Sequence, residues 1–363
     1  MRAAILREAH QAIDVADVTI ADPIGHEVLI RTAAAGVCHS DLHFQQGLYT
    51  CPMPAVLGHE SAGIVEAVGP EVTYVKPGDH VITCLSVFCG HCRYCTTGRP
   101  NLCEDRESTQ RKETDSPRLS QDGDELFQFA NLASYAEQLL VHEHAVCKIR
   151  EEMPLDKAAL IGCGVTTGVG AALNTADVKP GSTVAVFGCG GIGLSAVQGA
   201  RIAAAGRVVA VDTITSKLQL AKQLGATDLV NARDGDPVEQ IMDLTGGNGV
   251  AYSFEAVGLK ETAEQAFGVI ERGGTATIIG MIPEGVKIEI TGQDILGERK
   301  LQGSSMGSNR FRVDMPNYVE MYLRGQLLLD EMISHHIALD DINEACEALL
   351  VGEVARQVIV FDM

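Results

Sequence analysis

The sequence predicts an α/β protein with two domains, one rich in antiparallel β structure and one built on a doubly wound parallel sheet. Its 363 residues exceed the usual size of a single domain. Up to about residue 100, short β-like runs alternate with Gly and Pro turns, whereas from about 165 to 305 apolar strands alternate with helical stretches. With 46% hydrophobic and 21% charged residues, the chain is not disordered and has enough apolar side chains for two cores.

The first part of the chain predicts a loop-rich antiparallel domain. Its strand-like runs lie at 28–33, 62–68 and 80–84, and turns such as Lys-Pro-Gly-Asp at 76–79 separate them. Residues 104–126 are polar and dense in charge, which indicates a long surface loop.

The second part predicts βαβ units. Strands are expected at 183–187, 208–211 and 275–279, with helices at 193–205 and 216–224. Strands joined through helices run parallel, so we expect a parallel sheet here. From about 306 the chain returns to mixed elements and ends on a strand-like run at 357–361.

Charge and targeting patterns narrow the partners. Lysine and arginine total 28 against 48 aspartate and glutamate residues, a formal net charge of −20. A chain this acidic repels phosphate backbones and anionic membranes, so we expect neither nucleic acid nor membrane as a partner. The N-terminus lacks a signal-peptide pattern and no stretch approaches eighteen uninterrupted apolar residues, so a cytoplasmic protein is expected.

Eleven cysteines are too few for a disulfide scaffold at this length, and their number is odd, which favours metal binding or catalysis. The clearest pattern is Cys89-x2-Cys92-x2-Cys95-x7-Cys103. At this spacing four thiolates can surround one tetrahedral Zn²⁺. A zinc site is therefore favoured over the alternative that the four cysteines are scattered buried thiols or disulfides. A four-thiolate site is closed to substrate, so its role is predicted to be structural.

A dinucleotide motif follows the expected strand 183–187. It is a G-x-G-x-x-G that opens a helix, and Asp212 ends the next strand. Glycines there permit a tight turn and close approach of a pyrophosphate, while Asp212 accepts hydrogen bonds from the adenosine ribose and repels a 2′-phosphate. The motif therefore predicts NAD rather than NADP, held by Gly188, Gly190, Gly191, Ile192 and Gly193.

A third set of residues is dispersed along the chain. It comprises GVCHSDLH at 36–43, GHE at 58–60 and GCG at 162–164. Two thiols and an imidazole from separate loops would leave a fourth zinc position open for water or substrate. Spacing alone does not bring the three segments together.

These motifs resemble those of the zinc-dependent alcohol dehydrogenases of the medium-chain dehydrogenase/reductase family. GVCHSD, GHE, the four-cysteine lobe, GCGVTTG and GCGGIG occur in the family's order, and the similarity runs nearly end to end. The resemblance implies a GroES-like β-rich catalytic domain formed by residues 1–164 and 306–363, with a structural zinc lobe at about 85–105. It also implies a Rossmann NAD-binding domain at 165–305.

The resemblance assigns the zinc chemistry to specific residues. Cys38, His59 and Cys163 match the ligands of the catalytic zinc. Asp41 matches the carboxylate that orients the ligand imidazole, and Glu60 matches a carboxylate close to the metal.

Substrate and cofactor contacts follow from the same resemblance. Ser40 matches the hydroxyl that touches the substrate oxygen, and His43 matches the surface end of the proton relay. The remaining expected cofactor contacts are His39, Thr167, Lys217, Ile279 and Arg356, the last at the pyrophosphate.

The implied activity is zinc-dependent hydride transfer between a primary alcohol and NAD, with two Zn²⁺ per chain. Leu85 stands where the family commonly has an aromatic residue, which suggests a broader substrate slot and makes aromatic and allylic alcohols candidates. The expected partners are a small alcohol or aldehyde and further copies of the chain in a homodimer or homotetramer.

Two alternatives stay open. One is a formaldehyde dehydrogenase that uses a thiol adduct, although residues 45–57 lack the acidic stretch of such enzymes and Arg106 only lies close to their glutathione contact. The other is a non-catalytic NAD-binding relative, which the retention of every family zinc-ligand position disfavours.

Overall fold

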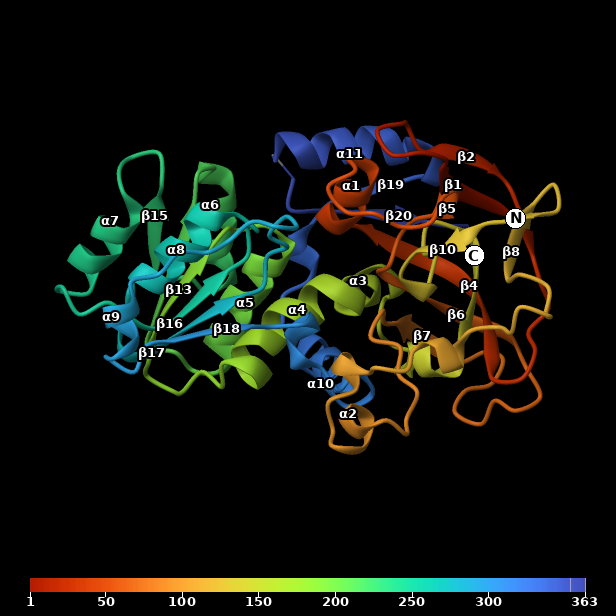
Figure 1. Ribbon diagram of the computed structural model, residues 1–363, viewed down its shortest axis with the longest axis horizontal. Helices are drawn as coiled ribbons and strands as arrows, with labels where there is room; N and C mark the ends of the chain where they lie inside the picture. The colour runs from red at the N-terminus through yellow and green to blue at the C-terminus, as the bar shows by residue number, and fades with distance from the viewer. Residues whose placement is uncertain (353, 363) are drawn as a thin grey trace. The chain divides into compact units, whose positions relative to one another are not determined.

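The computed structural model describes residues 1–352 and 354–362, which form two compact units (Figure 1). The first comprises residues 1–163 and 310–363, and the second residues 164–309. The sequence predicted the divisions at 164/165 and 305/306, close to these positions.

The first unit is organised around a 7-stranded sheet in the order β12-β7-β6-β4-β20-β19, in which β11 also pairs with β4. All pairs are antiparallel except β19 with β20. Because β20 pairs with β4, the end of the chain completes a sheet begun near its start. The strands are β4 (Glu27–Val37), β6 (Ser61–Val68), β7 (His80–Thr83), β11 (Gln138–His142), β12 (Val146–Lys148), β19 (Ile333–Ile337) and β20 (Arg356–Val360).

Smaller elements complete the first unit. A 4-stranded sheet has the order β10-β5-β1-β2, and a 3-stranded sheet the order β3-β8-β9. Their strands are β1 (Arg2–Leu6), β2 (Asp14–Asp17), β3 (Thr19–Ile20), β5 (Ala55–Val56), β8 (Leu119–Gln121), β9 (Asp124–Glu125) and β10 (Phe127–Gln128). The helices are α1 (His39–Gln45), α2 (Arg93–Thr96), α3 (Leu155–Leu160), α10 (Phe311–Leu323) and α11 (Ile342–Val351).

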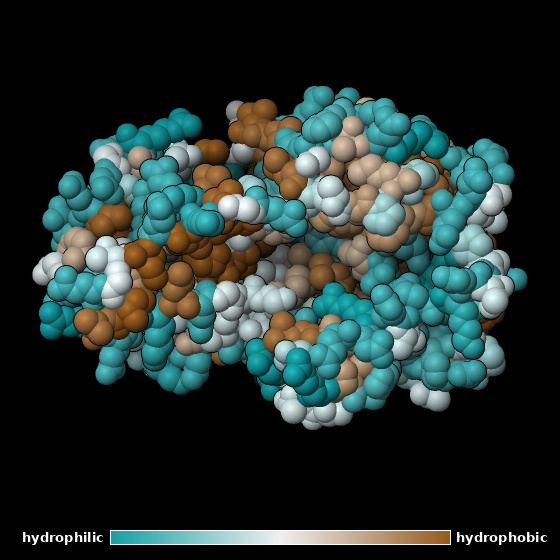
Figure 2. All heavy atoms as spheres, in the orientation of Figure 1, coloured by the Kyte–Doolittle hydropathy of each residue, from teal (hydrophilic) through white to brown (hydrophobic). Residues whose placement is uncertain are grey.

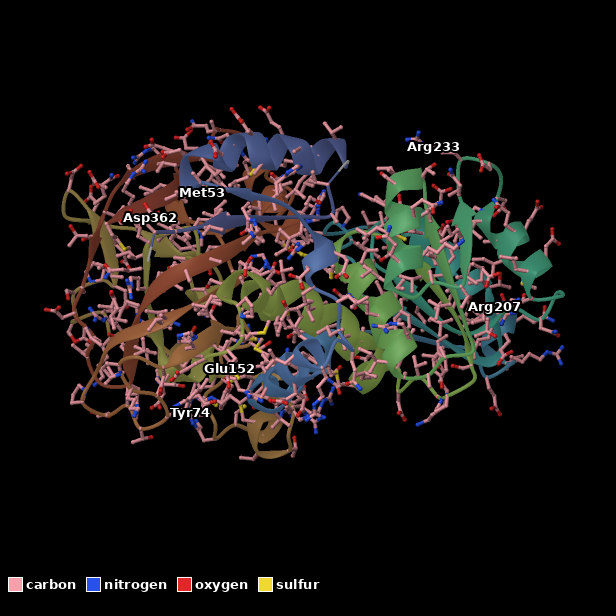
Figure 3. All side chains as sticks on the ribbon, turned by 180° about the vertical axis from the view of Figure 1, so that it is seen from behind. Met53, Tyr74, Glu152, Arg207, Arg233 and Asp362 are labelled. Carbon is pink, nitrogen blue, oxygen red and sulfur yellow. The ribbon has the colours of Figure 1, made fainter. Side chains whose placement is uncertain are left out.

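Helix α10 belongs to the first unit because its N-terminal residues are anchored there. The Arg312 guanidinium donates hydrogen bonds to backbone carbonyls of Glu143 and Val146 and lies 3.8 Å from the centre of the Tyr74 ring, a residue labelled in Figure 3. These contacts place the division of the chain at 309/310, a few residues later than the sequence predicts.

The second unit is a parallel sheet of 6 strands in the order β15-β14-β13-β16-β17-β18. Renumbered within the unit, this is the 3-2-1-4-5-6 order of a Rossmann fold, as predicted. The strands are β13 (Thr183–Phe187), β14 (Arg207–Asp212), β15 (Asp228–Asn231), β16 (Val250–Glu255), β17 (Ile270–Ile278) and β18 (Lys300–Gly303). The helices are α4 (Thr166–Gly170), α5 (Gly191–Ile202), α6 (Thr215–Leu224), α7 (Pro237–Leu244), α8 (Lys260–Gly268) and α9 (Gly292–Ile295).

Most predicted elements of this unit are present with small shifts. Strand 183–187 matches β13, and helix 216–224 matches α6 to within one residue. The helix predicted at 193–205 begins at Gly191 and ends at Ile202, because Ala204 takes a left-handed φ of 60° that a helix cannot continue through.

One continuous helical segment, Leu155–Thr175, is long and apolar enough to cross a membrane by length and composition. Within it, 83% of the most apolar window is buried, which is typical of a core helix.

The charged segment 104–126 was predicted to be a solvated loop; residues 112–117 at its centre are exposed or half-buried, as expected, but the residues on either side of them are anchored to the fold. Arg118 is buried, the side chain of Arg111 is only 8% exposed, and both bond to Glu27 at the start of β4, at 2.7 and 2.6 Å. Leu119 is also buried, at the start of the short β8–β9 hairpin. Charge density alone concealed this anchoring, because the partner carboxylate lies far away in sequence.

The charge of Glu27 is stabilised despite its burial. Burial alone would raise its pKa, but hydrogen bonds from Arg111, the Ile24 amide and Arg118 outweigh that effect and lower the pKa below its ordinary value of 4.5. The resulting stabilisation is complete above pH 4.5 and is lost as the pH falls through the lowered pKa.

Replacing Glu27 by Gln is expected to lower the free energy of unfolding by about 3 kcal/mol near neutral pH, because two buried guanidinium groups lose their counter-charge. Chemical denaturation measured from pH 3 to 7 should show the gap between wild type and variant closing at acidic pH. Glu66→Gln, which removes a half-exposed partner of Arg31, is the control and should cost less than about 1 kcal/mol. A gap that widens with acid would contradict the assignment.

Candidate functional site

A buried cluster in the first unit joins three distant segments of the chain. One ligand atom each from Cys38, His59, Glu60 and Cys163 lies within 4.8 Å of the others, and all four residues are buried. Cys38 precedes α1, the His-Glu pair precedes β6, and Cys163 lies in the π-helical turn Ile161–Val165. The fold thus brings together the thiols and imidazole that sequence spacing left dispersed.

The carboxylate of Asp41 connects the segments that carry two of these residues. Its Oδ1 lies 3.2 Å from Nδ1 of His59 and accepts a hydrogen bond of 3.0 Å from the Gly58 amide. Its Oδ2 accepts a hydrogen bond of 2.8 Å from the hydroxyl of Tyr135. A proton held on Nδ1 of His59 leaves Nε2 as the ligand atom, which is the arrangement that metal-binding histidines commonly have.

Close packing at this point requires glycine. Gly58 has a φ of +89°, and a Cβ there would lie 2.5 Å from Cδ1 of Tyr135. A Cβ on Gly36 would lie 2.9 Å from Cδ of Glu60. Both glycines therefore allow backbone and side chains of the cluster to approach one another.

The donors of the cluster fit Zn²⁺. A hydrogen bond with Cys163 and the charge of His59 lower the pKa of Cys38 well below its ordinary value, although burial opposes the shift. The pocket thus favours a thiolate beside an oriented imidazole and a second thiol, and this donor set suits zinc with a fourth position left for another ligand.

Glu60 forms a buried ion pair with Arg356. Burial raises the pKa of Glu60 to about 7, while the charge of Arg356 opposes the rise. Among the described residues, Oε1 of Glu60 has no hydrogen-bond partner. The guanidinium of Arg356 also donates to the Val37 carbonyl at 3.5 Å. The predicted contact of Arg356 with a pyrophosphate stays a prediction.

Ser40 and His43 lie one helical turn apart on α1, on the same side of the helix. Oγ of Ser40 is 3.7 Å from Sγ of Cys38. His43 is half-buried and stacks on Tyr49, with the ring centres 5.9 Å apart, and its predicted role as the surface end of a relay stays a prediction. Burial lowers the pKa of His43, and its Nδ1 has no hydrogen-bond partner among the described residues, which leaves a neutral imidazole able to accept a proton.

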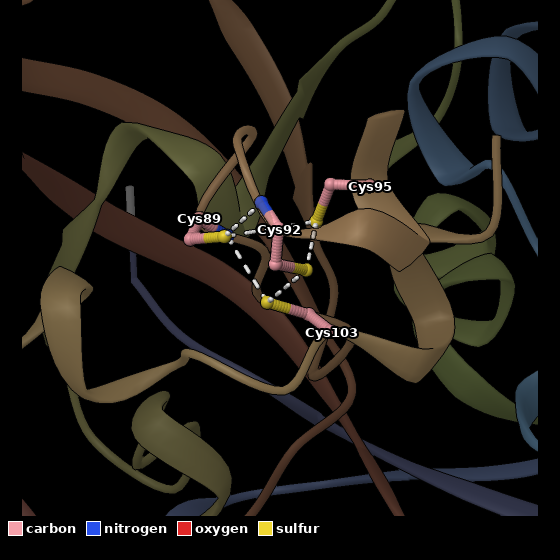
Figure 4. A group of neighbouring side chains, drawn as sticks. All are labelled: Cys89, Cys92, Cys95 and Cys103. Carbon is pink, nitrogen blue, oxygen red and sulfur yellow. Dashed lines mark hydrogen bonds between the residues drawn. The ribbon is translucent and has the colours of Figure 1, made fainter. Parts of the chain in front are cut away.

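The four cysteines of the lobe converge as Figure 4 shows, and their Sγ atoms lie within 4.8 Å of one another. Neighbouring sulfurs are 3.5 Å apart for Cys92 and Cys95, 3.9 Å for Cys89 and Cys95, and 4.0 Å for Cys92 and Cys103. A tetrahedral Zn²⁺ with bonds of about 2.3 Å places its sulfurs about 3.8 Å apart. Backbone amides of Cys89 and Cys92 donate to two of the sulfurs, which favours thiolates.

The glycine motif forms the turn between β13 and α5 in the second unit. Gly188 has a φ of +90°, and a Cβ on Gly193 would lie 1.7 Å from the Gly188 carbonyl oxygen. A Cβ on Gly190 meets nothing within 4 Å, so this glycine leaves open space at the helix N-terminus. The turn lies at the carboxyl end of β13, where the strand order reverses and dinucleotides bind in such sheets.

Asp212 ends β14 beside this turn. Its Oδ2 accepts a hydrogen bond of 2.7 Å from the Cys189 amide, and its Oδ1 one of 2.9 Å from the Ile214 amide. The carboxylate is therefore fixed next to the glycine loop, as the prediction of a ribose contact requires.

The other predicted cofactor residues occupy varied positions. Thr167 of α4 donates to the sulfur of Met306 at 3.2 Å, and the Ile279 amide donates to the Glu255 carbonyl at 2.8 Å. Lys217 lies half-buried on α6, and His39 is exposed at the start of α1. Their contacts with NAD stay predictions.

Tyr135 is a site residue that the sequence analysis missed. It belongs to none of the motifs, and its link to Asp41 is a contact between residues 94 positions apart. Only the fold reveals it.

Comparison with known proteins gives consistent matches. The family described as alcohol dehydrogenase GroES-like domain matches residues 25–151, and the family described as zinc-binding dehydrogenase matches residues 191–323. The S-(hydroxymethyl)glutathione dehydrogenase of Synechocystis sp. is 40% identical over 368 residues, with 99% of both chains covered. Alcohol dehydrogenase class-3 of Drosophila melanogaster is 40% identical over 373 residues, covering 99% of this chain and 97% of its own.

A solved structure agrees over the whole chain. Benzyl alcohol dehydrogenase from Acinetobacter calcoaceticus superposes with a TM-score of 0.92 at 32% identity, with 99% of each chain covered.

In the glycine turn, Gly193 is required for close packing, whereas Gly190 faces open space, and this difference can be tested. Gly193→Ala should lower the free energy of unfolding by at least about 1–3 kcal/mol, because the new methyl group overlaps a backbone oxygen. Gly190→Ala should change it by less than about 0.5 kcal/mol, since its methyl group meets open space. Denaturant unfolding of both variants checks this, and equal destabilisation would contradict the geometry.

Proposed function

We propose that this chain, which belongs to the zinc-dependent alcohol dehydrogenases of the medium-chain dehydrogenase/reductase family, interconverts primary alcohols and aldehydes with NAD and two Zn²⁺ per chain. The observation that carries the proposal is the buried convergence of Cys38, His59 and Cys163. Two thiols and one imidazole hold a metal and leave a position for an oxygen ligand, whereas the four-cysteine lobe leaves none.

The catalytic site divides its tasks among residues of the first unit. A zinc ion held by Cys38, His59 and Cys163 would supply Lewis acidity toward an alcohol or carbonyl oxygen. Asp41 accepts the hydrogen bond of the Nδ1 proton and so keeps the imidazole oriented with Nε2 toward the metal position. Ser40, next to Cys38, would take the hydroxyl proton of the substrate as it gives up its own, and neutral His43, one turn further along α1, would accept the released proton and pass it to water.

NAD would supply the hydride acceptor. The open N-terminus of α5 at Gly190 would receive its pyrophosphate, since unsatisfied amides there favour negative charge. Asp212 would bind the adenosine ribose and exclude a 2′-phosphate. Because the chain as a whole is strongly acidic, an anionic cofactor must be attracted by local positive charge, such as the partial positive charge at the N-terminus of α5.

We propose aromatic and allylic alcohols as the preferred substrates. Leu85 instead of an aromatic residue supports a broader slot, and the solved relative from Acinetobacter calcoaceticus is named for benzyl alcohol.

A second candidate is oxidation of a formaldehyde–thiol adduct. It is favoured by the two relatives at 40% identity, one named S-(hydroxymethyl)glutathione dehydrogenase and the other a class-3 enzyme. Arg106 also lies close in sequence to the glutathione contact of such enzymes, and a guanidinium there would suit a carboxylate. Formaldehyde oxidation that requires glutathione or mycothiol would favour this candidate over simple alcohols.

A homodimer or homotetramer is part of the proposal. Large apolar side chains of the second unit are exposed, with Leu296 at 85% and Ile295 at 44%, and Figure 2 shows apolar patches on the visible face of this unit. Exposed apolar patches of this kind commonly mark protein contacts.

The proposed zinc role predicts the effect of Cys38→Ser. NADH formation across a panel of primary, allylic and aromatic alcohols should fall at least about 100-fold, because a lost Lewis acid removes several kcal/mol of stabilisation. Cys51→Ser, a substitution of a half-buried thiol outside both clusters, should keep wild-type rates. Full turnover by Cys38→Ser would overturn the proposal, and a wild type that is inactive with zinc and NAD on the whole panel would favour a non-catalytic relative.

The proposed ribose contact predicts a change in cofactor choice. Asp212→Asn should reduce the ratio of kcat/KM with NAD to that with NADP about tenfold or more, because the charge that repels a 2′-phosphate is gone. Asp234→Asn removes an exposed charge elsewhere in the same unit and should leave the ratio unchanged. An unchanged ratio in Asp212→Asn would show that another group selects the cofactor.

A further inference from the structure

The buried hydroxyl of Tyr135 lies next to two residues of the proposed catalytic zinc site, Asp41 and Cys38. The residue is 0% exposed and Asp41 is 1% exposed. The hydroxyl donates to Oδ2 of Asp41 at 2.8 Å and lies 3.4 Å from the amide of Cys38, from which it accepts. One phenolic oxygen therefore contacts both the carboxylate that orients one ligand and the backbone of another.

The position of this hydroxyl is fixed by the backbone around it. The Tyr135 amide donates to the Leu57 carbonyl at 3.0 Å, and its carbonyl accepts from the Ala4 amide at 2.8 Å. The neighbouring Ser134 amide donates to the Gly58 carbonyl at 2.9 Å. Tyr135 is thus tied to the residues immediately before His59, and its ring packs where Gly58 leaves room.

The carboxylate of Asp41 has few other ways to stay oriented. Oδ1 serves Gly58 and His59, while Oδ2 accepts from Tyr135. A buried carboxylate that loses one donor keeps the cost of desolvation and gains freedom to turn. Any turn of Asp41 changes the direction from which His59 presents Nε2.

We propose that Tyr135 is a positioning residue of the catalytic zinc site, which holds Asp41 in the orientation that aims His59 at the metal. The inference rests on the zinc site proposed above. The ring of Tyr135 packs against Gly58, and a phenylalanine ring would fill the same space. The proposed positioning role therefore belongs to the hydroxyl, which bonds to Asp41. Tyr135→Phe therefore removes the proposed function of the residue with the least effect on packing.

The test measures zinc in the intact protein and does not depend on turnover. Zinc release to a chromophoric chelator should show two phases in wild type, and Cys38→Ser identifies the phase of the catalytic site by abolishing it. We expect Tyr135→Phe to weaken zinc binding at this site about tenfold, as loss of an outer partner does elsewhere, and to leave the phase of the four-cysteine lobe unchanged. With Co²⁺ in the catalytic site, the visible spectrum should shift because the imidazole is reoriented.

Two further variants distinguish positioning from general stability. Tyr322→Phe removes another tyrosine hydroxyl that donates to a carboxylate, Asp330 at 3.0 Å, and should leave both zinc phases as in wild type. In an Asp41→Asn background, Tyr135→Phe should add little, because the residue acts through that carboxylate.

The outcomes are separable. Unchanged catalytic-site release and an unchanged Co²⁺ spectrum in Tyr135→Phe would overturn the inference while leaving the proposed function intact. Equal acceleration of both phases, additive effects with Asp41→Asn, or failure of Tyr135→Phe to fold would show a structural role and overturn it as well. A wild-type protein that binds no metal at Cys38, His59 and Cys163 would overturn both.

Discussion

The hydrogen bonds of one buried carboxylate, Asp41, hold the candidate active site together. The chain places two thiols and an imidazole in a water-poor pocket, where each would be costly without fixed partners. Asp41 fixes the imidazole of His59 and the loop before it, and Tyr135 in turn fixes Asp41. Because Cys38 directly precedes α1 and Asp41 lies in the first turn of that helix, one short segment of the chain carries a ligand and the group that orients another.

Backbone geometry imposes a second constraint, since both candidate sites depend on glycines at which an added Cβ would overlap neighbouring atoms. Gly58 lets the Tyr135 ring lie against the ligand loop, and Gly193 lets α5 approach the turn after β13. In each case a contact that a Cβ would block brings a chemical group into place: the imidazole in the first unit and the helix N-terminus in the second.

Much of this could be predicted from the sequence because the information is local. The βαβ pattern of the parallel sheet, the glycine turn and the four-cysteine lobe each involve residues close together in the chain, so the sequence alone predicted them. The convergence of Cys38, His59 and Cys163 required a family resemblance, because no local rule brings such distant segments together. Tyr135 and the Glu27 ion pairs escaped prediction, since each depends on partners supplied by other elements of the fold.

The central claim is that the cluster of Cys38, His59 and Cys163 is a zinc site distinct from the four-cysteine lobe. Anomalous diffraction from crystals of the purified protein at the zinc absorption edge tests it most directly. We predict two peaks per chain, one among those three residues and one among the cysteines of the lobe. A single peak in the lobe, from protein purified with zinc present, would contradict the claim.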